Sequence, residues 1–179
     1  MTTYLKFKLS IKAALAVLIV GSIFAGCYHI SRGGSSKASK SLTSVAVPLF
    51  KNECEVMGIE VPATEAFIAK LDYYGATKVE KIENARSIIE GKVIDYKLST
   101  AAIDQRHKIT EYRLTLTLNI MVRDTKTNEV VFKKEEYSDS YDFKVPRDSI
   151  IRKREVKRAE EFLCNKIASA IITELYEGF

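Results

Sequence analysis

The clearest pattern in the chain is a strict alternation of apolar and polar positions that begins at Tyr112. The apolar positions are Tyr112, Leu114, Leu116, Leu118, Ile120 and Val122, and only Met121 interrupts the polar residues between them. This period of two predicts a strand with one buried face and one largely polar face. A polar turn over 124–129 follows, and Val130–Phe132 then begin the returning arm of a hairpin.

Two other stretches have the period of a helix. Over Ser149–Glu177, with Asp148 as the cap, the apolar stripe consists of Val156, Ala159, Leu163, Ile167, Ile171 and Leu175. An earlier, shorter helix has Pro62 in its first turn and ends at Gly75. Its apolar positions at helical spacing are Phe67, Ile68 and Leu71.

Three further strands are expected before the hairpin. Thr43–Phe50 is β-branched and apolar, with Val45, Val47 and Leu49 on one face, and a loop over 51–59 that contains Gly58 follows it. A short strand is expected over 77–82. A longer one covers 86–98, with Gly91 as a bulge or a close-approach point. The sequence therefore predicts an α+β fold: a two-layer sandwich with a mostly antiparallel sheet of about four to five strands and two helices on one face.

The N-terminus has the layout of a bacterial secretion signal. Three lysines precede an uncharged run over 13–25, which is shorter than the roughly 20 residues that a membrane-spanning helix needs. The sequence Phe24-Ala25-Gly26-Cys27 resembles a lipobox, in which the cysteine receives a diacylglycerol and becomes the acylated N-terminus. The alternative is an ordinary secreted protein with a cysteine there by chance.

From this layout we expect a signal peptide over 1–26, a lipid-anchored Cys27 with a flexible tether over 27–42, and one domain over 43–179. Residues 31–40 are rich in glycine and serine, as flexible tethers are. Acyl chains at about 0.8 kcal/mol per buried methylene hold such a domain on a bilayer. Tyr28 is not the aspartate of an inner-membrane retention signal, which indicates the outer membrane of a Gram-negative cell.

Composition and charge exclude several classes of function. The 179 residues contain 28 basic and 23 acidic side chains, and removing the three lysines of residues 1–26 leaves 25 against 23, a net charge of +2. A nucleic-acid partner is therefore not expected, because such proteins carry a larger basic excess. His29 and His107 have no partner at metal-ligand spacing, so neither a metal nor a cofactor is expected beyond the lipid on Cys27.

No catalytic motif is present, and we do not expect an enzyme. The chain lacks a phosphate-cradling glycine loop and a Gly-x-Ser-x-Gly turn, and its carboxylates are not paired in an apolar context. Cys54 and Cys164 either form a disulfide in an oxidising compartment or leave Cys164 as a buried free thiol beside the apolar helix stripe.

Two basic groups are candidates for binding an anion. Five cations over 152–158 are either a solvated helix face, with Glu160 and Glu161 as partners, or a site for an anionic lipid or glycolipid headgroup. Arg106 and Lys108 form a smaller group just before the long strand. A phosphorylated sugar suits such positions, because arginine and lysine form charge-assisted hydrogen bonds with phosphate.

Several motifs, in order, resemble the LptE family of lipopolysaccharide-assembly lipoproteins. They are Cys27-Tyr28-His29, Val45-Ala46-Val47-Pro48-Leu49-Phe50-Lys51-Asn52, the glycine strand around Asn84–Val93, Glu111-Tyr112-Arg113-Leu114 and the turn Arg123-Asp124-Thr125-Lys126-Thr127. The glycine that family members usually carry after the cysteine, and an aspartate before the glycine strand, are missing. The resemblance spans Cys27–Phe179.

The resemblance implies a partner and a ligand. Family members plug the lumen of the large outer-membrane β-barrel LptD, on its periplasmic side, and help insert lipopolysaccharide into the outer leaflet. They bind lipopolysaccharide through basic residues near the sheet edge, which by region correspond to Arg106 and Lys108, and to Lys144 and Arg147. The alternative function is a periplasmic lipoprotein that regulates peptidoglycan synthesis or belongs to a curli-type secretion system, since those proteins share an early Val-Ala-Val-type strand.

Overall fold

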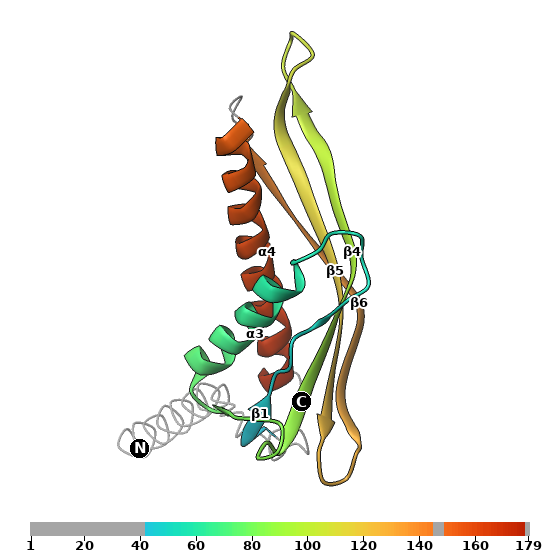
Figure 1. Cartoon of the computed structure of the whole chain (residues 1–179), viewed down its shortest axis with the longest axis vertical. Coiled ribbons are helices and arrows are strands. Elements are labelled where there is room, and N and C mark those ends of the chain that lie inside the picture. The colour runs from blue at the N-terminus through green and yellow to red at the C-terminus, as the bar shows by residue number, and fades with distance from the viewer. Residues whose placement is uncertain (1–41, 145–148, 178–179) are drawn as a thin grey trace, which may run out of the picture. The chain divides into compact units, whose positions relative to one another are not determined.

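The computed structural model describes residues 42–144 and 149–177, which form six strands and two helices (Figure 1). In chain order these are β1 (Ser44–Ala46), β2 (Lys51–Asn52), α3 (Glu60–Tyr74), β3 (Lys78–Val79), β4 (Ser87–Ile103), β5 (Ile109–Asp124), β6 (Val130–Lys144) and α4 (Ser149–Glu177). Both helices lie on the same side of the sheet, so the predicted α+β class with two layers is confirmed.

The sheet is mixed and has one more strand than expected. Its order is β3-β1-β4-β5-β6, with β2 also pairing β4. The long strands β4, β5 and β6 are antiparallel, whereas β1 runs parallel to both β3 and β4, and β2 runs parallel to β4. The parallel pairs arise because α3 carries the chain back to the starting end of the sheet before β3, as a crossover connection must.

The strand predicted over Thr43–Phe50 is wrong in its length and in its face. Only Ser44–Ala46 form β1, since Pro48 has no backbone N–H for a ladder. The backbone N–H of Phe50 donates instead to the hydroxyl of Thr64 on α3 at 3.0 Å. Val45 is buried, but Leu49 is 61% exposed, so the two do not share a buried face.

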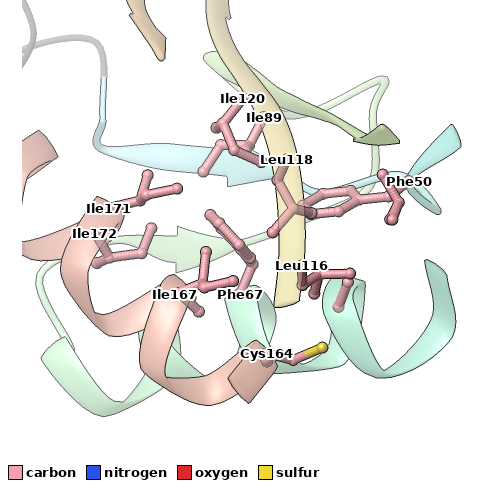
Figure 2. Close-up of a cluster of buried hydrophobic side chains, with 14 of the residues drawn as sticks. Phe50, Phe67, Ile89, Leu116, Leu118, Ile120, Cys164, Ile167, Ile171 and Ile172 are labelled. Atoms are coloured by element: carbon pink, nitrogen blue, oxygen red, sulfur yellow. The ribbon is translucent and has the colours of Figure 1, made fainter. Parts of the chain in front are cut away.

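The long alternating strand packs as its sequence predicts. Leu114, Leu116, Leu118, Ile120 and Val122 of β5 are all buried, and the helix stripe of α4 covers them together with Phe67 and Leu71 of α3 (Figure 2). Five of the six predicted stripe positions are at most 2% exposed, and the sixth, Val156, is half-buried. The core thus lies between one face of β4–β6 and the two helices.

The two helices begin and end much as the sequence indicates. Pro62 lies in the first turn of α3, and Gly75, with a φ of 62°, ends that helix by donating its N–H to the carbonyls of Leu71 and Asp72. The predicted cap of α4, Asp148, lies outside the described residues. Near its other end α4 packs on α3, where the rings of Tyr74 and Tyr176 stack at 5.4 Å.

Gly91 is a close-approach point and not a bulge. The ring of Phe50 lies directly against it, so that a side chain at Gly91 would overlap the ring. The register shifts of β4 on β5 come later, between Val93 and Asp95 and again between Thr100 and Ile103. The predicted short strand over 77–82 is present as β3, and the strand predicted over 86–98 extends to Ile103.

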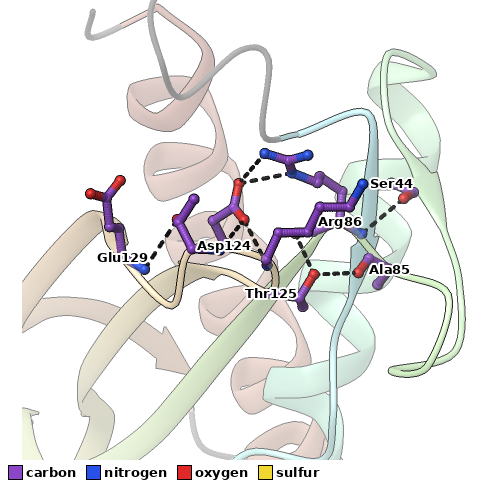
Figure 3. Close-up of polar contacts among 8 residues, drawn as sticks. Ser44, Ala85, Arg86, Asp124, Thr125 and Glu129 are labelled. Atoms are coloured by element: carbon purple, nitrogen blue, oxygen red, sulfur yellow. Dashed lines mark hydrogen bonds and ion pairs between the residues drawn. The ribbon is translucent and has the colours of Figure 1, made fainter.

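The hairpin of β4 and β5 has a base and a tip. At the base, β1 pairs with β4 at Ser87, and the side chain of Arg86 reaches Asp124 at the end of β5 (Figure 3). The tip is the turn over 104–108, at the opposite end of both strands, and it extends past the first turn of α4 (Figure 1). The described chain enters the sheet at the base, through β1.

Candidate functional site

One aspartate, Asp104, fixes the backbone of the hairpin tip, residues 104–108. The carboxylate Oδ1 of Asp104 accepts hydrogen bonds from the backbone N–H groups of Arg106 at 2.8 Å and Lys108 at 2.9 Å. The N–H of Asp104 also donates to the carbonyl of Lys108 at 2.8 Å, and His107 takes a left-handed φ of 57°. These bonds use backbone groups, and in the described part of the chain the cationic ends of Arg106 and Lys108 have no ion pair.

A third predicted cation lies at the same end of the sheet. Lys144, the last residue of β6, is exposed and is the register partner of Glu111 on β5, which in turn pairs with Ala102 of β4. The structure therefore gathers Arg106, Lys108 and Lys144 near the tip, although 36 residues separate Lys108 from Lys144 in the chain. Arg147 and Cys27, the other two predicted site residues, lie outside the described residues.

Apolar side chains lie beside these cations, which sequence reasoning did not anticipate. Ile103 and Ile109 are register partners directly below the turn, and they are 58% and 41% exposed. Leu98, further along β4, is also exposed. An apolar residue on each side of a short polar turn was the available signal in the sequence. Cations above exposed isoleucines give the tip an amphiphilic surface, suited to a ligand with both phosphate and hydrocarbon groups.

The second basic group, on α4, is arranged differently. Glu155, and not the expected Glu160 or Glu161, pairs with Arg158 at 2.8 Å and approaches Arg154 at 3.9 Å. Glu160 instead accepts a hydrogen bond from the Tyr96 hydroxyl at 2.8 Å. The carboxylate of Glu160 is turned towards β4 by this bond, which is why it does not serve the cations of its own helix.

A hollow of about 1110 Å³ adjoins this helix face. Met57 and Ile150, both highly exposed, line it together with Lys153 and Lys157. Arg154 lines it as well, and Glu65, Glu160 and Glu161 balance the three cations of the wall. The hollow is therefore less selective for an anion than the tip, whose cations Arg106 and Lys108 have no ion pair among the described residues.

The outer face of the sheet is polar and rich in hydroxyl groups. Thr115 and Thr117 on β5 face Ser140 and Ser138 on β6, and the Thr117 hydroxyl lies 3.2 Å from that of Ser138. Nearer the tip, Arg113 forms two hydrogen bonds of 2.7 Å with Asp142 across the same strands. Hydrogen bonding to Arg113 lowers the pKa of Asp142. Neither described helix, α3 or α4, covers this face, so its hydroxyl groups can meet a polar surface.

The two described cysteines, Cys54 and Cys164, differ in burial. Cys54 and Cys164 are both free thiols, so of the two alternatives the sequence left open, the buried free thiol is the one observed. Burial, with Glu160 nearby, raises the pKa of Cys164 to about 12. Among residues 42–144 and 149–177, no three metal-ligating side chains come together, and no helix is long and apolar enough to span a membrane.

Solved structures share this fold. A protein from Caulobacter crescentus CB15 described as a lipoprotein is 11% identical, with a TM-score of 0.54 over 78% of this chain and 92% of its own. A minor lipoprotein from Acinetobacter baumannii is 9% identical, with a TM-score of 0.50 over 76% of this chain and 92% of its own. At these identities the similarity establishes the fold alone. The comparison with curated proteins gives no match.

The described domain is thus an α+β domain of the kind found in bacterial lipoproteins, with an exposed cationic hairpin tip. The model of the lipopolysaccharide-assembly family LptE matches residues 42–175, about three quarters of the chain, and the chain belongs to that family. It is accordingly a lipopolysaccharide-assembly lipoprotein of the cell envelope, in a family that is not enzymatic.

Proposed function

We propose that this lipoprotein is anchored in the outer membrane by lipid on Cys27, occupies the lumen of an LptD-type barrel, and contacts the phosphates of lipopolysaccharide through its hairpin tip. No other cofactor and no nucleic acid takes part. The observation that carries the proposal is the tip itself: Arg106 and Lys108 are held by Asp104 above the exposed pair Ile103 and Ile109, with Lys144 at the same end.

The chemistry of the tip matches that of the glycolipid. Lipid A combines phosphate groups with acyl chains, and arginine and lysine bind phosphate by charge-assisted hydrogen bonds. The family match supports this ligand over the peptidoglycan and curli-type alternatives. The mature net charge of +2 is small, so attraction depends on where cations converge and not on bulk charge.

The outer face of the sheet supports the barrel partner. The lumen of a large outer-membrane barrel is polar, whereas its outward face is apolar. The hydroxyl-bearing face of β5 and β6, with Thr115, Thr117, Ser138 and Ser140, can form hydrogen bonds with such a wall. The opposite face is already covered by α3 and α4, so only one face of the sheet is available to the barrel.

A titration with lipopolysaccharide tests the ligand. The lipidated protein in neutral detergent is compared with the double variant Arg106→Asp, Lys108→Asp. Hydrogen bonds to charged groups contribute about 1.5–3 kcal/mol each, so we expect the affinity to fall about tenfold or more. Added salt should weaken binding of the wild type in the same way. The matched control is Lys81→Asp, Lys126→Asp, because both lysines are exposed at the base of the sheet.

The outcomes separate the parts of the proposal. Unchanged affinity in the tip variant, with loss in Arg152→Asp, Arg154→Asp, would move the site to α4. Co-purification of a co-expressed LptD-type barrel tests the plug, and its failure with the wild-type chain would reject that part. Metabolic labelling with a palmitate analogue tests the anchor: Cys27→Ala should lose the label, and a label that persists would refute lipidation there.

A further inference from the structure

Strand β4 is paired along its whole length on one side but only near its base on the other. β5 pairs with it from Ser87 to Ile103. On the opposite side, β1 pairs at Ser87 and Ile88, and β2 pairs at Lys92 and Val93. From Asp95 to Ile103, no strand within the described ranges lies on that side, and Figure 1 shows this stretch as the free margin of the hairpin.

The first six residues of this margin are regular. Asp95 to Thr100 pair one to one with Thr117 to Tyr112, and the ladder shifts register only before Asp95 and after Thr100. In an antiparallel ladder, alternate residues point their N–H and C=O groups away from the neighbouring strand. The six-residue stretch Asp95–Thr100, here called the β4 edge, therefore presents a straight row of backbone donors and acceptors that β5 does not use.

The other long edge of the sheet, β6, is protected against such pairing. Its charged side chains are Lys133, Lys134, Glu135, Glu136, Asp139, Asp142 and Lys144. Glu136 has a φ of 50° at a register shift, and ion pairs from Lys134 to Glu174 and from Asp139 to Lys166 tie this strand to α4. Charges, an irregular backbone and coverage by a helix are the features that block edge-to-edge pairing.

The β4 edge has much less of this protection. Its only charged side chains are Asp95 and Lys97, which are of opposite sign, and no charge follows until Asp104. Leu98 and Ile103 are 40% and 58% exposed. All residues of β4 from Ile94 to Ile103 are exposed or only half-buried, so no layer of side chains covers this part of the strand within the described ranges. A regular edge with no net charge, opposite a protected one, indicates that pairing is permitted on one side of the sheet only.

We propose that the β4 edge accepts an extended, largely uncharged strand from the protein partner, a mode of recognition known as β-strand addition. This inference rests on the proposed barrel partnership. The wall strands of a closed barrel are already paired on both sides, so the added strand comes from a segment of the barrel protein outside its closed wall. Lipid is not the occupant, because acyl chains cannot satisfy a row of backbone N–H and C=O groups.

A second copy of this chain fits the edge less well. Antiparallel self-pairing across Asp95–Thr100 would place the register shift before Asp95 of one copy opposite the shift after Thr100 of the other. A regular strand from a different protein brings no second register shift to the pairing. Two copies in the purified complex, cross-linked through β4, would therefore contradict the inference.

Residue-resolved hydrogen exchange tests the proposal. The lipoprotein, alone and in complex with a co-expressed LptD-type barrel, is exchanged in deuterium and fragmented by electron transfer. Amides of the β4 edge that already face β5 should change little. The alternate amides should exchange at least tenfold more slowly in the complex, a pattern that general burial would not produce. The control is residues 137–142 of β6, whose outward amides should not gain this protection.

Two proline variants give an independent readout. The backbone N–H groups of neighbouring strand residues point to opposite sides, so those of Ser99 and Thr100 differ: one faces β5 and the other points outward from the β4 edge. Proline has no N–H, so one of Ser99→Pro and Thr100→Pro removes the outward group and the other removes the group that faces β5. The variant that keeps the wild-type melting temperature is the outward one, and it should reduce barrel co-purification at least fivefold. The matched substitutions Ser99→Ala and Thr100→Ala should not.

The outcomes distinguish this inference from the proposed function. If the wild-type complex forms but the β4 edge exchanges as fast as in the free protein, the inference is overturned and the barrel partnership stands. The same holds if the outward proline co-purifies like the wild type. If no wild-type complex forms, the partnership itself fails, and the inference falls with it.

Discussion

Arg86 and Asp124 link the start of β4 to the end of β5 at the base of the sheet. Nε and Nη2 of Arg86, just before β4, both lie 2.8 Å from Oδ2 of Asp124, the last residue of β5 (Figure 3). Oδ1 of the same carboxylate accepts the backbone N–H groups of Lys126 at 2.8 Å and Thr127 at 3.1 Å. Asp124 is only 2% exposed, so a single buried carboxylate orders both the strand pair and the β5–β6 turn.

This carboxylate predicts a pH dependence of stability. Burial alone would raise the pKa of Asp124, but the hydrogen bonds from Thr127, Lys126 and Arg86 outweigh it and lower the pKa from 3.8 to about 2. Because the folded pKa is the lower one, its stabilisation is complete above pH 3.8 and is lost as the pH falls towards 2. The Asp124→Asn variant should have a lower free energy of unfolding than the wild type at pH 7. That free energy should also fall less steeply between pH 4 and pH 2.

Urea unfolding of both proteins across this pH range is the measurement. Other carboxylates titrate in both chains, so the difference between the two curves isolates Asp124. Parallel curves would show that Asp124 does not carry this linkage.

The contact between Gly91 and Phe50 predicts a second effect on stability. A methyl group at Gly91 would overlap the ring of Phe50, and overpacking of a core costs about 1–3 kcal/mol. Gly91→Ala should therefore lower the free energy of unfolding by that amount. In a Phe50→Leu background the penalty should shrink, because the smaller side chain leaves room. An equal penalty in both backgrounds would show that the ring is not the cause.

The two faces of β5 should respond differently to a carboxylate. Leu116 is fully buried, so Leu116→Asp forces an unpaired charge into the core and should cost about 3 kcal/mol or more. Thr117, its neighbour on the outer face, should tolerate Thr117→Asp at a cost of about 1 kcal/mol or less. Melting temperatures of the two variants decide this, and equal losses would refute a sheet with only one buried face.

Thiol labelling should separate Cys54 from Cys164. Cys164 is 1% exposed and burial raises its pKa to about 12, so at pH 8 it is both inaccessible and protonated. Cys54 is half-buried and should react with a maleimide in the native protein, whereas Cys164 should react only in denaturant. Peptide mapping identifies the labelled cysteine, with Cys54→Ser as the control. Native labelling at Cys164 would contradict its burial.

The parts of the fold that follow from local patterns were predictable. The alternation from Tyr112 to Val122 specified β5 and its buried face, because a period of two allows only one assignment of side chains. Local patterns also predicted the apolar stripe of α4 and the end of α3 at Gly75. The error at Thr43–Phe50 has a tertiary cause, since Phe50 leaves the strand to bond Thr64 and to cover Gly91.

The site was predictable only in part. Arg106 and Lys108 were identified as a basic pair, but their place at a hairpin tip depends on β4 extending to Ile103, beyond the predicted end at residue 98. That extension carries no alternation of buried and exposed residues, because neither face of it is covered. Lys144 joins the tip only through the register of β6 on β5, and no pattern in one sequence specifies that register.

The length of the β4–β5 hairpin acts as a molecular ruler. Ser87, where β1 pairs with the start of β4, is 16 residues from Ile103, and at about 3.3 Å per residue the strand spans about 50 Å. The hydrocarbon core of a bilayer is about 30 Å thick. With the proposed anchor on Cys27 holding the base at one leaflet, the hairpin is long enough to carry Arg106 and Lys108 to the headgroups of the other, with no change in its fold.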